Sequence, residues 1–424
     1  MRLTRAQGHL LDEGTDAQRK AMEILLTVGR LADAPRLVPI TSAHVSGASY
    51  KMIGDPGLEF LEDFARDARV SVPTTVNPLG TDLAQWEELG VPATFAEKQG
   101  RIARAYETMG VRPTFSCTPY LIGVRPAFGE HVAWAESSAV CFANSVLGAR
   151  TNREGGPAAL AAAIIGATPE YGLHTDEGRE PTVIVQVRVR PRGIDYSLIG
   201  LVAGERVGDG LPFFRGFRAS EGDLKWLGAA LASSGACGMF HLEGVTPEAR
   251  EARVKGLKSI TIAEKDLIAA KRAHTDGTEA DLIGLGSPQL SPEELQRIAQ
   301  LIDRTPPRIP VWIFTSRVVR DANPDAVGIV ERHGGRVLAD TCLEVTLLEH
   351  RFGTVATPSG KGAYYLRASA SRRSSSTMSR LCWSDTHENP RAWNCSGPGV
   401  RPGNRFPDSV LVRRRCGPGH GIDP

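Results

Sequence analysis

The chain has 424 residues, of which 41% are hydrophobic and 23% charged. This composition is typical of a soluble globular protein with two or three domains, and it excludes a disordered chain or a small disulfide-stapled scaffold. Fifty Lys and Arg against 48 Asp and Glu leave a formal net charge of +2. The charge therefore gives no general reason to expect binding to nucleic acid or to an acidic membrane.

Apolar positions alternate along the chain between helical spacing and short buried runs. The spacing over 15–31, behind a Thr15-Asp16 cap, predicts an amphipathic helix, and 37–41 is typical of a buried strand. The same alternation predicts further strands at 70–75, 114–118, 183–189, 238–242, 311–314 and 337–347, further helices at 58–68, 97–109, 133–138, 157–165, 224–233, 247–255, 292–302 and 323–333, and a strand with a helix over 259–273. This pattern favours an α/β fold with parallel sheets, closed by a strand-helix-strand unit at about 308–348.

The sequence contains no sign of export or membrane insertion. Asp12 and Glu13 interrupt the start of the chain, and the least polar run, 158–167, is about half as long as a bilayer span. We therefore expect a cytoplasmic protein. Seven widely spaced cysteines, an odd number, favour metal ligation or burial over a disulfide framework.

The composition changes abruptly after residue 366. The stretch 368–424 has no Lys, contains three of the seven cysteines, and begins with a Ser-rich run at 369–379. One hypothesis is a disordered tail. The other is out-of-frame translation, because a shifted reading of GC-rich codons for 377–382 restores an ordinary helix end. We divide the chain into a folded region, 1–366, with two or three α/β subdomains, and an atypical tail, 367–424.

Standard catalytic motifs are absent from the sequence. There is no Gly-rich phosphate loop ending in Gly-Lys-Ser/Thr, no His-Glu-x-x-His and no Gly-x-Ser-x-Gly, so kinase, zinc-protease and α/β-hydrolase functions lose support. Dense polar strings instead follow several predicted strands, where open α/β sheets bind ligands. In 41–47, small hydroxyls beside Gly47 allow close approach of a carboxylate or phosphate, and His44 is available for proton transfer. A capped turn with a satisfied His is the alternative.

Three more polar strings are candidate sites. In 116–153, Arg150 and Arg153 lie close to Asn152, which suits bidentate capture of a carboxylate, although structural salt bridges explain them nearly as well. In 172–179, His174 belongs either to a site or to a solvated loop. In 359–361, Lys361 is either functional or simply exposed.

The cysteines fall into two groups by their surroundings. Cys117 and Cys342 lie beside Thr near predicted strand ends, where thiolates from different loops can converge on iron or another thiophilic metal. Cys141 and Cys237 stand in apolar settings, which are typical of small buried hydrophobic residues.

Taken together, these strings resemble the aconitase X family, specifically its large catalytic subunit. The resemblance runs in order over about 37–366. It is carried by 42–47, 117–120, 126–131, 134–137, 143–153, 172–176, 245–249, 340–342 and 359–361.

The resemblance implies an aconitase-like, multi-domain α/β/α fold with mostly parallel sheets and a hydro-lyase activity. Such an enzyme removes water from a hydroxy acid, with iron or an iron-sulfur cluster as Lewis acid at the leaving hydroxyl. The family uses cysteine ligands, and Cys117 and Cys342 match them best. The third ligand would be Cys237, which we prefer, or Cys141.

The resemblance also implies roles for polar residues and for a partner. Ser46, His174 and Lys361 would be catalytic, and substrate would be bound by Ser46, Asn152, Arg153, His174 and Lys361. Related aconitases carry a catalytic serine on a swivelling domain that nothing in this chain resembles. We therefore expect activity only with a small swivelling-domain subunit.

The family divides between two substrates. Amino-acid usage typical of a GC-rich gene and the expected split subunits favour dehydration of cis-3-hydroxy-L-proline to Δ1-pyrroline-2-carboxylate. The alternatives are the large subunit of a 5-phosphomevalonate dehydratase and a degenerate subunit without catalytic activity. A generic nucleotide-binding domain is weakened because no Gly-rich fingerprint follows a predicted strand.

Overall fold

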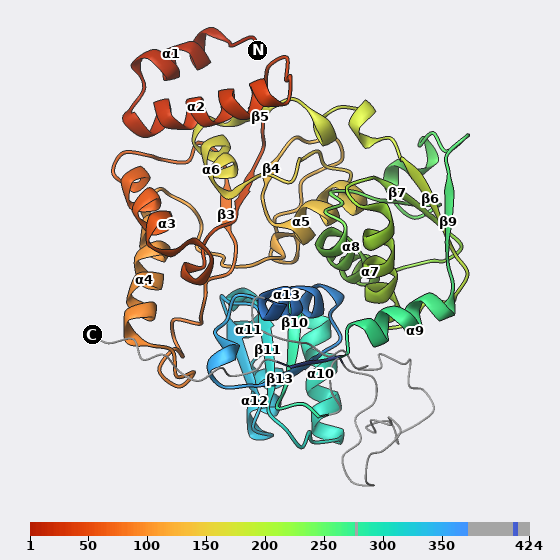
Figure 1. The fold of residues 1–424 in the computed structure, drawn as a ribbon. Coiled ribbons are helices and arrows are strands. Elements are labelled where there is room, and N and C mark those ends of the chain that lie inside the picture. Colours follow the sequence, from red (N-terminus) through yellow and green to blue (C-terminus); the bar gives the residue numbers. More distant parts are fainter. Residues whose placement is uncertain (276–278, 372–409, 414–424) are drawn as a thin grey trace.

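Three separate sheets of parallel strands organise the molecule (Figure 1). The structure is a computed structural model that describes residues 1–275, 279–371 and 410–413. Most of the tail that we predicted to be disordered or out of frame lies outside the described residues. None of the helices in the described parts of the chain combines the length and apolarity that crossing a bilayer requires.

The first sheet lies in the N-terminal part of the chain and is fully buried. Its strand order is β3-β2-β4, all parallel. The strands are β2 (Ala43–Val45), β3 (Thr74–Val76) and β4 (Ala133–Trp134), and an antiparallel pair, β1 (Leu37–Pro39) and β5 (Ala167–Pro169), lies beside them. The helices of this part are α1 (Arg5–Glu13), α2 (Asp16–Leu31), α3 (Tyr50–Ala65), α4 (Ala93–Thr108), α5 (Ser137–Phe142), which runs on into a π-helical turn, η2 (Ala143–Leu147), and α6 (Gly156–Ile165).

The second sheet has four parallel strands in the order β8-β7-β6-β9. These strands are β6 (Val183–Val187), β7 (Pro212–Arg215), β8 (His241–Leu242) and β9 (Ser259–Ile262). The helices α7 (Asp195–Val207), α8 (Glu221–Ser234) and α9 (Glu264–Ala273) accompany it. Figure 1 shows α7 and α8 between this sheet and the rest of the molecule, so the sheet lies at the periphery.

The third sheet has the order β12-β11-β10-β13-β14, and only β14 is antiparallel. Its strands are β10 (Leu282–Leu290), β11 (Val311–Thr315), β12 (Arg336–Ala339), β13 (Thr354–Thr357) and β14 (Val410–Arg413). Its helices are α10 (Pro292–Arg304), α11 (Arg317–Asp321), α12 (Pro324–Arg332) and α13 (Gly360–Ser371). Short 3-10 turns elsewhere are η1 (Pro119–Leu121), η3 (Gly172–His174), η4 (Glu177–Arg179), η5 (Pro247–Arg250) and η6 (Leu348–His350).

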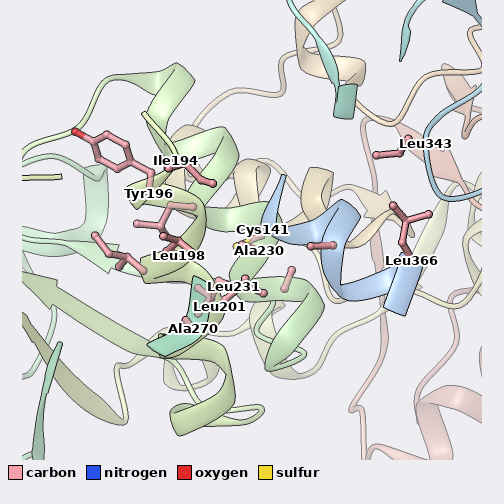
Figure 2. Packing of buried hydrophobic residues seen from close by; sticks show 14 of the residues in the cluster. Cys141, Ile194, Tyr196, Leu198, Leu201, Ala230, Leu231, Ala270, Leu343 and Leu366 are labelled. Atoms are coloured by element: carbon pink, nitrogen blue, oxygen red, sulfur yellow. The ribbon is translucent and has the colours of Figure 1, made fainter. Parts of the chain in front are cut away.

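A shared core joins the second and third sheets. Figure 2 shows Leu201 of α7, Leu231 of α8 and Leu366 of α13 within one cluster of buried side chains. Each of these three leucines is fully buried, so each contributes about 2 kcal/mol of hydrophobic stabilisation. The second and third sheets therefore hold fixed positions relative to one another.

The predicted fold class is confirmed, because the structure is α/β with mostly parallel sheets. The helices α2 and α10 and the strands β6 and β11 lie where the sequence predicted them. The sequence did not predict four helices, α1, α7, α11 and α13, or seven strands, β2, β4, β5, β7, β10, β13 and β14.

Several predicted elements are wrong or too long. Residues 133–138 begin as strand β4, and helix α5 starts only at Ser137, because the Glu136 carboxylate caps it by accepting from the Ala139 amide. Strand 337–347 ends at Ala339, because Asp340 turns the chain with a φ of +59°. The stretch 114–118 is not a strand, and the helix predicted at 247–255 is only the turn η5.

Candidate active site

Polar residues follow all three strands of the first sheet at its carboxyl edge. Ser46 follows β2, Asn77 follows β3 and Glu136 comes two residues after β4. Because the strands are parallel, these residues share one edge, where open α/β sheets bind ligands. Backbone approach is close here, since a Cβ on Gly156, the first residue of α6, would lie 2.6 Å from the Ser46 carbonyl oxygen.

The carboxyl edge of the third sheet meets this edge. The Leu79 amide donates to the Asp340 carbonyl over 2.8 Å, and Thr341 Oγ1 donates to the Leu79 carbonyl over 2.9 Å. Residues 340–342 follow β12 and residues 359–361 follow β13, so both polar strings that were predicted there reach the junction. The two sheets therefore present their carboxyl ends to a common space.

A buried ion pair crosses this junction. Lys361 Nζ lies 2.6 Å from Glu136 Oε1, and both side chains are 6% exposed. The other oxygen, Oε2, accepts from Ser138 Oγ over 2.6 Å and from the Ala139 amide over 2.7 Å. Lys361 is therefore not the exposed surface lysine of the alternative interpretation, and its charge is matched inside the protein.

The pair keeps both groups ionised. Burial alone would raise the pKa of Glu136, but Lys361 and the hydrogen bonds from Ser138 and Ala139 outweigh burial and lower it. Burial alone would lower the pKa of Lys361, but the charge of Glu136, with smaller contributions from Glu344 and the nearby cysteines, raises it well above its usual value. Lys361 thus acts as a fixed cation and hydrogen-bond donor, since it cannot accept a proton at neutral pH.

Cys117 and Cys342 are brought to this same junction from different parts of the chain. Both are buried, and both lie close enough to Lys361 to affect its pKa. Gln289 connects their loops, because its amide donates to Cys117 Sγ over 3.3 Å and its side chain donates to the Thr341 carbonyl over 2.9 Å. Burial raises the pKa of Cys117 to about 12 and that of Cys342 well above its usual value, so both are thiols without a metal.

These two sulfur atoms fit part of an iron site. Thiolates are the preferred ligands of iron-sulfur centres, and a bound metal deprotonates the thiols that hold it. Glu344 lies beside them, where its carboxylate accepts from Cys342 Sγ over 2.8 Å and from Ser287 Oγ. Among the described residues, no three His, Cys, Asp or Glu side chains are arranged as a complete metal site. The chain thus supplies two soft donors at the junction.

Cys237 and Cys141 belong to the apolar core shared with α8. Figure 2 shows Cys141 in this cluster. The Cys237 thiol donates to the Gly208 carbonyl over 3.1 Å, and its burial raises its pKa to about 12. The structure does not place Cys237, the preferred third ligand, with Cys117 and Cys342. Both residues match the small buried hydrophobic interpretation.

The predicted substrate residues around Asn152 are also engaged elsewhere. Arg153 donates to the Ala232 carbonyl at the end of α8 over 3.1 Å, and Asn152 bonds the backbone of Tyr171 and Leu173. Neither interaction leads to the Lys361 junction. Arg150 forms an ion pair with Asp176, as its structural alternative predicted.

His174 pairs with a second histidine at the amino end of β4. Its Nδ1 lies 2.9 Å from His131 Nδ1, and the two rings stack at 5.1 Å between centroids. Burial, with the nearby His131 and Arg179, lowers the pKa of His174 to about 3. His174 is thus a buried neutral imidazole, and the structure does not bring it to Lys361.

Comparisons with known proteins identify the family. Family models described as the first, second and third domains of aconitase X match residues 1–177, 181–272 and 280–383. The chain belongs to the aconitase X family. A crystal structure titled Thermococcus kodakaraensis aconitase X (holo-form) superimposes with a TM-score of 0.81 at 43% identity, and the match covers 87% of this chain and 95% of that one.

Two aconitase X relatives differ in activity. The phosphomevalonate dehydratase large subunit of Methanothermobacter thermautotrophicus is 46% identical over 372 residues, which cover 86% of this chain and 93% of the relative. The cis-3-hydroxy-L-proline dehydratase of Pseudomonas aeruginosa is 37% identical over 387 residues, which cover 85% of this chain and 65% of the relative. Both are dehydratases, so the prediction of an aconitase X hydro-lyase is confirmed at that level.

Several residues of the junction were not predicted as site residues. Glu136 lay inside the string 134–137 that carries the family resemblance, but the predicted helix over 133–138 hid its place after a strand. Ser287 and Gln289 had no such signal, because β10 was not predicted. Glu344 lay inside the strand predicted at 337–347, which ends at Ala339. His44 was a candidate, and it lies on β2 of the first sheet, where its Nδ1 is 2.8 Å from Thr75 Oγ1.

We expect His44 to make the stability of the protein depend on acidity. Burial lowers the pKa of His44 from 6.5 to about 4, so the unfolded chain binds a proton more readily than the folded one. The stabilisation that depends on neutral His44 is fully present above pH 6.5 and is lost as the pH falls to 4. Urea unfolding should show that wild type loses about 3 kcal/mol more than His44→Asn over this range. The exposed His9→Asn serves as the control, and equal losses in wild type and His44→Asn would contradict the expectation.

Proposed function

We propose that this chain is the large subunit of a dehydratase that acts on 5-phosphomevalonate. The observation that carries the proposal is the buried Lys361–Glu136 pair beside Cys117 and Cys342, where the carboxyl edges of two sheets meet. A charged lysine held in a dry site stabilises an anionic substrate, and two thiols beside it are suitable iron ligands.

The substrate assignment is supported by the relatives. The Methanothermobacter large subunit is more similar to this chain than the Pseudomonas hydroxyproline enzyme, 46% against 37% identity. The chain also covers 93% of the former and 65% of the latter, which favours the large-subunit organisation. We therefore prefer 5-phosphomevalonate over cis-3-hydroxy-L-proline, the substrate that the sequence alone favoured.

Each residue of the junction has a role in the proposed reaction. An iron centre held by Cys117 and Cys342 would supply a Lewis acid for the leaving hydroxyl. Lys361 donates hydrogen bonds to the substrate carboxylate and favours the negative charge that develops as the α proton leaves. Glu136 holds the lysine in position through its cap on α5. Ser46 Oγ has no hydrogen-bond partner among the described residues, and it contacts the substrate from the first sheet.

We assign the base that accepts the substrate's α proton to a partner subunit. Lys361 is held protonated, and His174 is paired with His131 away from the junction. Relatives of this chain are named large subunits, which implies a small subunit. We propose that a small swivelling-domain subunit completes the site and supplies the base.

The substrate proposal is tested with the chain purified anaerobically together with an aconitase X small subunit. We expect the complex to dehydrate 5-phosphomevalonate with a kcat/KM at least about 100-fold above that for cis-3-hydroxy-L-proline, because a site that hydrogen-bonds one substrate rejects a ligand that leaves its polar groups unpaired. The large chain alone should be inactive. Turnover of the hydroxyproline alone would establish the other substrate.

The iron assignment is tested by metal content. We expect Cys117→Ala and Cys342→Ala to lose iron and activity together, because each removes one of two converging thiols. Cys141→Ala and Cys237→Ala are matched controls, since both thiols lie in the apolar core, and they should retain iron. Loss of iron in Cys237→Ala, with the fold intact by circular dichroism, would restore Cys237 as a ligand.

A further inference from the structure

One arginine lies between two buried carboxylates next to Cys342. Arg317 Nε donates to Asp340 Oδ2 over 2.8 Å, and its Nη2 lies 3.6 Å from Asp82 Oδ1. Asp82 is fully buried and Asp340 is 4% exposed. The first carboxylate follows the first sheet and the second follows β12, so the arginine joins the two sheets beside the proposed site.

The two carboxylates do not depend equally on Arg317. Asp82 Oδ2 also accepts from Arg320 Nη1 over 3.3 Å and from the Ala339 amide over 3.0 Å. Asp340 has only Arg317, because its Oδ1 finds no partner within the described residues. Without Arg317, a buried Asp340 carboxylate beside Asp82 would lose its only hydrogen-bonded ion-pair partner, so it would have to take up a proton or leave its place beside Asp82.

The position of Asp340 determines where Cys342 lies. Its φ of +59° is a left-handed conformation that is costly for a residue other than Gly or Asn, so surrounding contacts must hold it. Its carbonyl accepts from Leu79, and the next residue, Thr341, is bonded to Leu79 and to Gln289. Since the Gln289 amide also bonds Cys117 Sγ, movement of this turn separates the two thiols.

We propose that Arg317 is a positioning residue for the metal site. Its positive charge offsets the repulsion between the Asp340 and Asp82 carboxylates. The left-handed turn at Asp340 then holds the Cys342 thiol beside that of Cys117. The inference rests on the proposed function, in which these two thiols hold iron. Arg317 acts through Asp340 and touches neither the substrate nor the metal.

Cadmium binding to the full chain without iron tests the proposal independently of activity. The probe is Cd²⁺ alone, read by its thiolate charge-transfer absorption. Each variant is also made with Cys342→Ser added. The difference in absorption between the two proteins is the binding that depends on Cys342. We expect Arg317→Gln to weaken this binding by about tenfold, the effect typical of residues that orient metal ligands. Arg336→Gln is the matched control, because it removes another ion pair between the same two parts of the chain, with Glu88.

A second substitution shows whether the effect runs through Asp340. Asn tolerates the left-handed conformation, so Asp340→Asn removes the charge without disturbing the turn. We expect the double variant R317Q/D340N to bind Cd²⁺ within about threefold of wild type, a difference under 1 kcal/mol. Failure of R317Q to fold, with recovery of the fold and of binding in the double variant, would also support the proposal.

Three results would overturn the proposal. Unchanged binding in R317Q would show that Arg317 does not position Cys342. An equal loss in R317Q and R317Q/D340N, or an equal loss in the Arg336→Gln control, would show that the effect is not carried by the charge of Asp340. If Cys117→Ser and Cys342→Ser leave cadmium binding unchanged, the thiols form no metal site, and the iron assignment of the proposed function fails instead.

Discussion

The buried ion pair between Glu136 and Lys361 is the interaction on which the site depends. It joins the end of β4 to the start of α13, elements that are 225 residues apart in sequence. Taking two such charges out of water costs several kcal/mol per ion, and the attraction between them often only repays that cost. A pair of hydrophobic residues would serve stability as well. The pair is therefore best explained by function, because a charged lysine in a closed site stabilises an anionic substrate.

The surroundings of the pair follow from the parallel sheets. Because the first and third sheets meet at their carboxyl ends, loops from both reach one space and bring Cys117 and Cys342 together. The second sheet takes no direct part, but α8 packs against both α5 and α13 and so fixes the two elements that carry the pair. The peripheral sheet thus supports the site through its helices. Substitutions where α8 packs against α5 and α13 should therefore disturb the site.

The sequence predicted the two cysteines and the lysine of the site more readily than the strand that lies between them. Cys117 and Cys342 were predicted because they lie beside Thr near predicted strand ends, and the role of Lys361 was implied by the resemblance to the family. Strand β10 was missed because Gly284, Gly286 and Pro288 interrupt its apolar pattern, although every residue of the strand is buried. Without β10, the roles of Gln289 and Ser287 had no basis.

Side-chain direction accounts for the residues that the structure places elsewhere. Arg153 and Asn152 lie in a string typical of the family, but their side chains turn toward α8 and toward η3. Cys237 is near a strand end in sequence, yet its thiol bonds a carbonyl in the apolar core. Linear spacing does not specify which way a loop residue points, because tertiary contacts decide it.

The most direct test of the central claim is a double-mutant cycle on Glu136→Gln and Lys361→Met, measured by urea unfolding of the large chain. If the two side chains form the buried pair that joins the sheets, each single variant leaves an unpaired buried group and should lose about 3 kcal/mol or more. The double variant should then lose much less than the sum, with a coupling of about 2 kcal/mol. Additive losses would show that the two residues do not meet, and the site as described here would not exist.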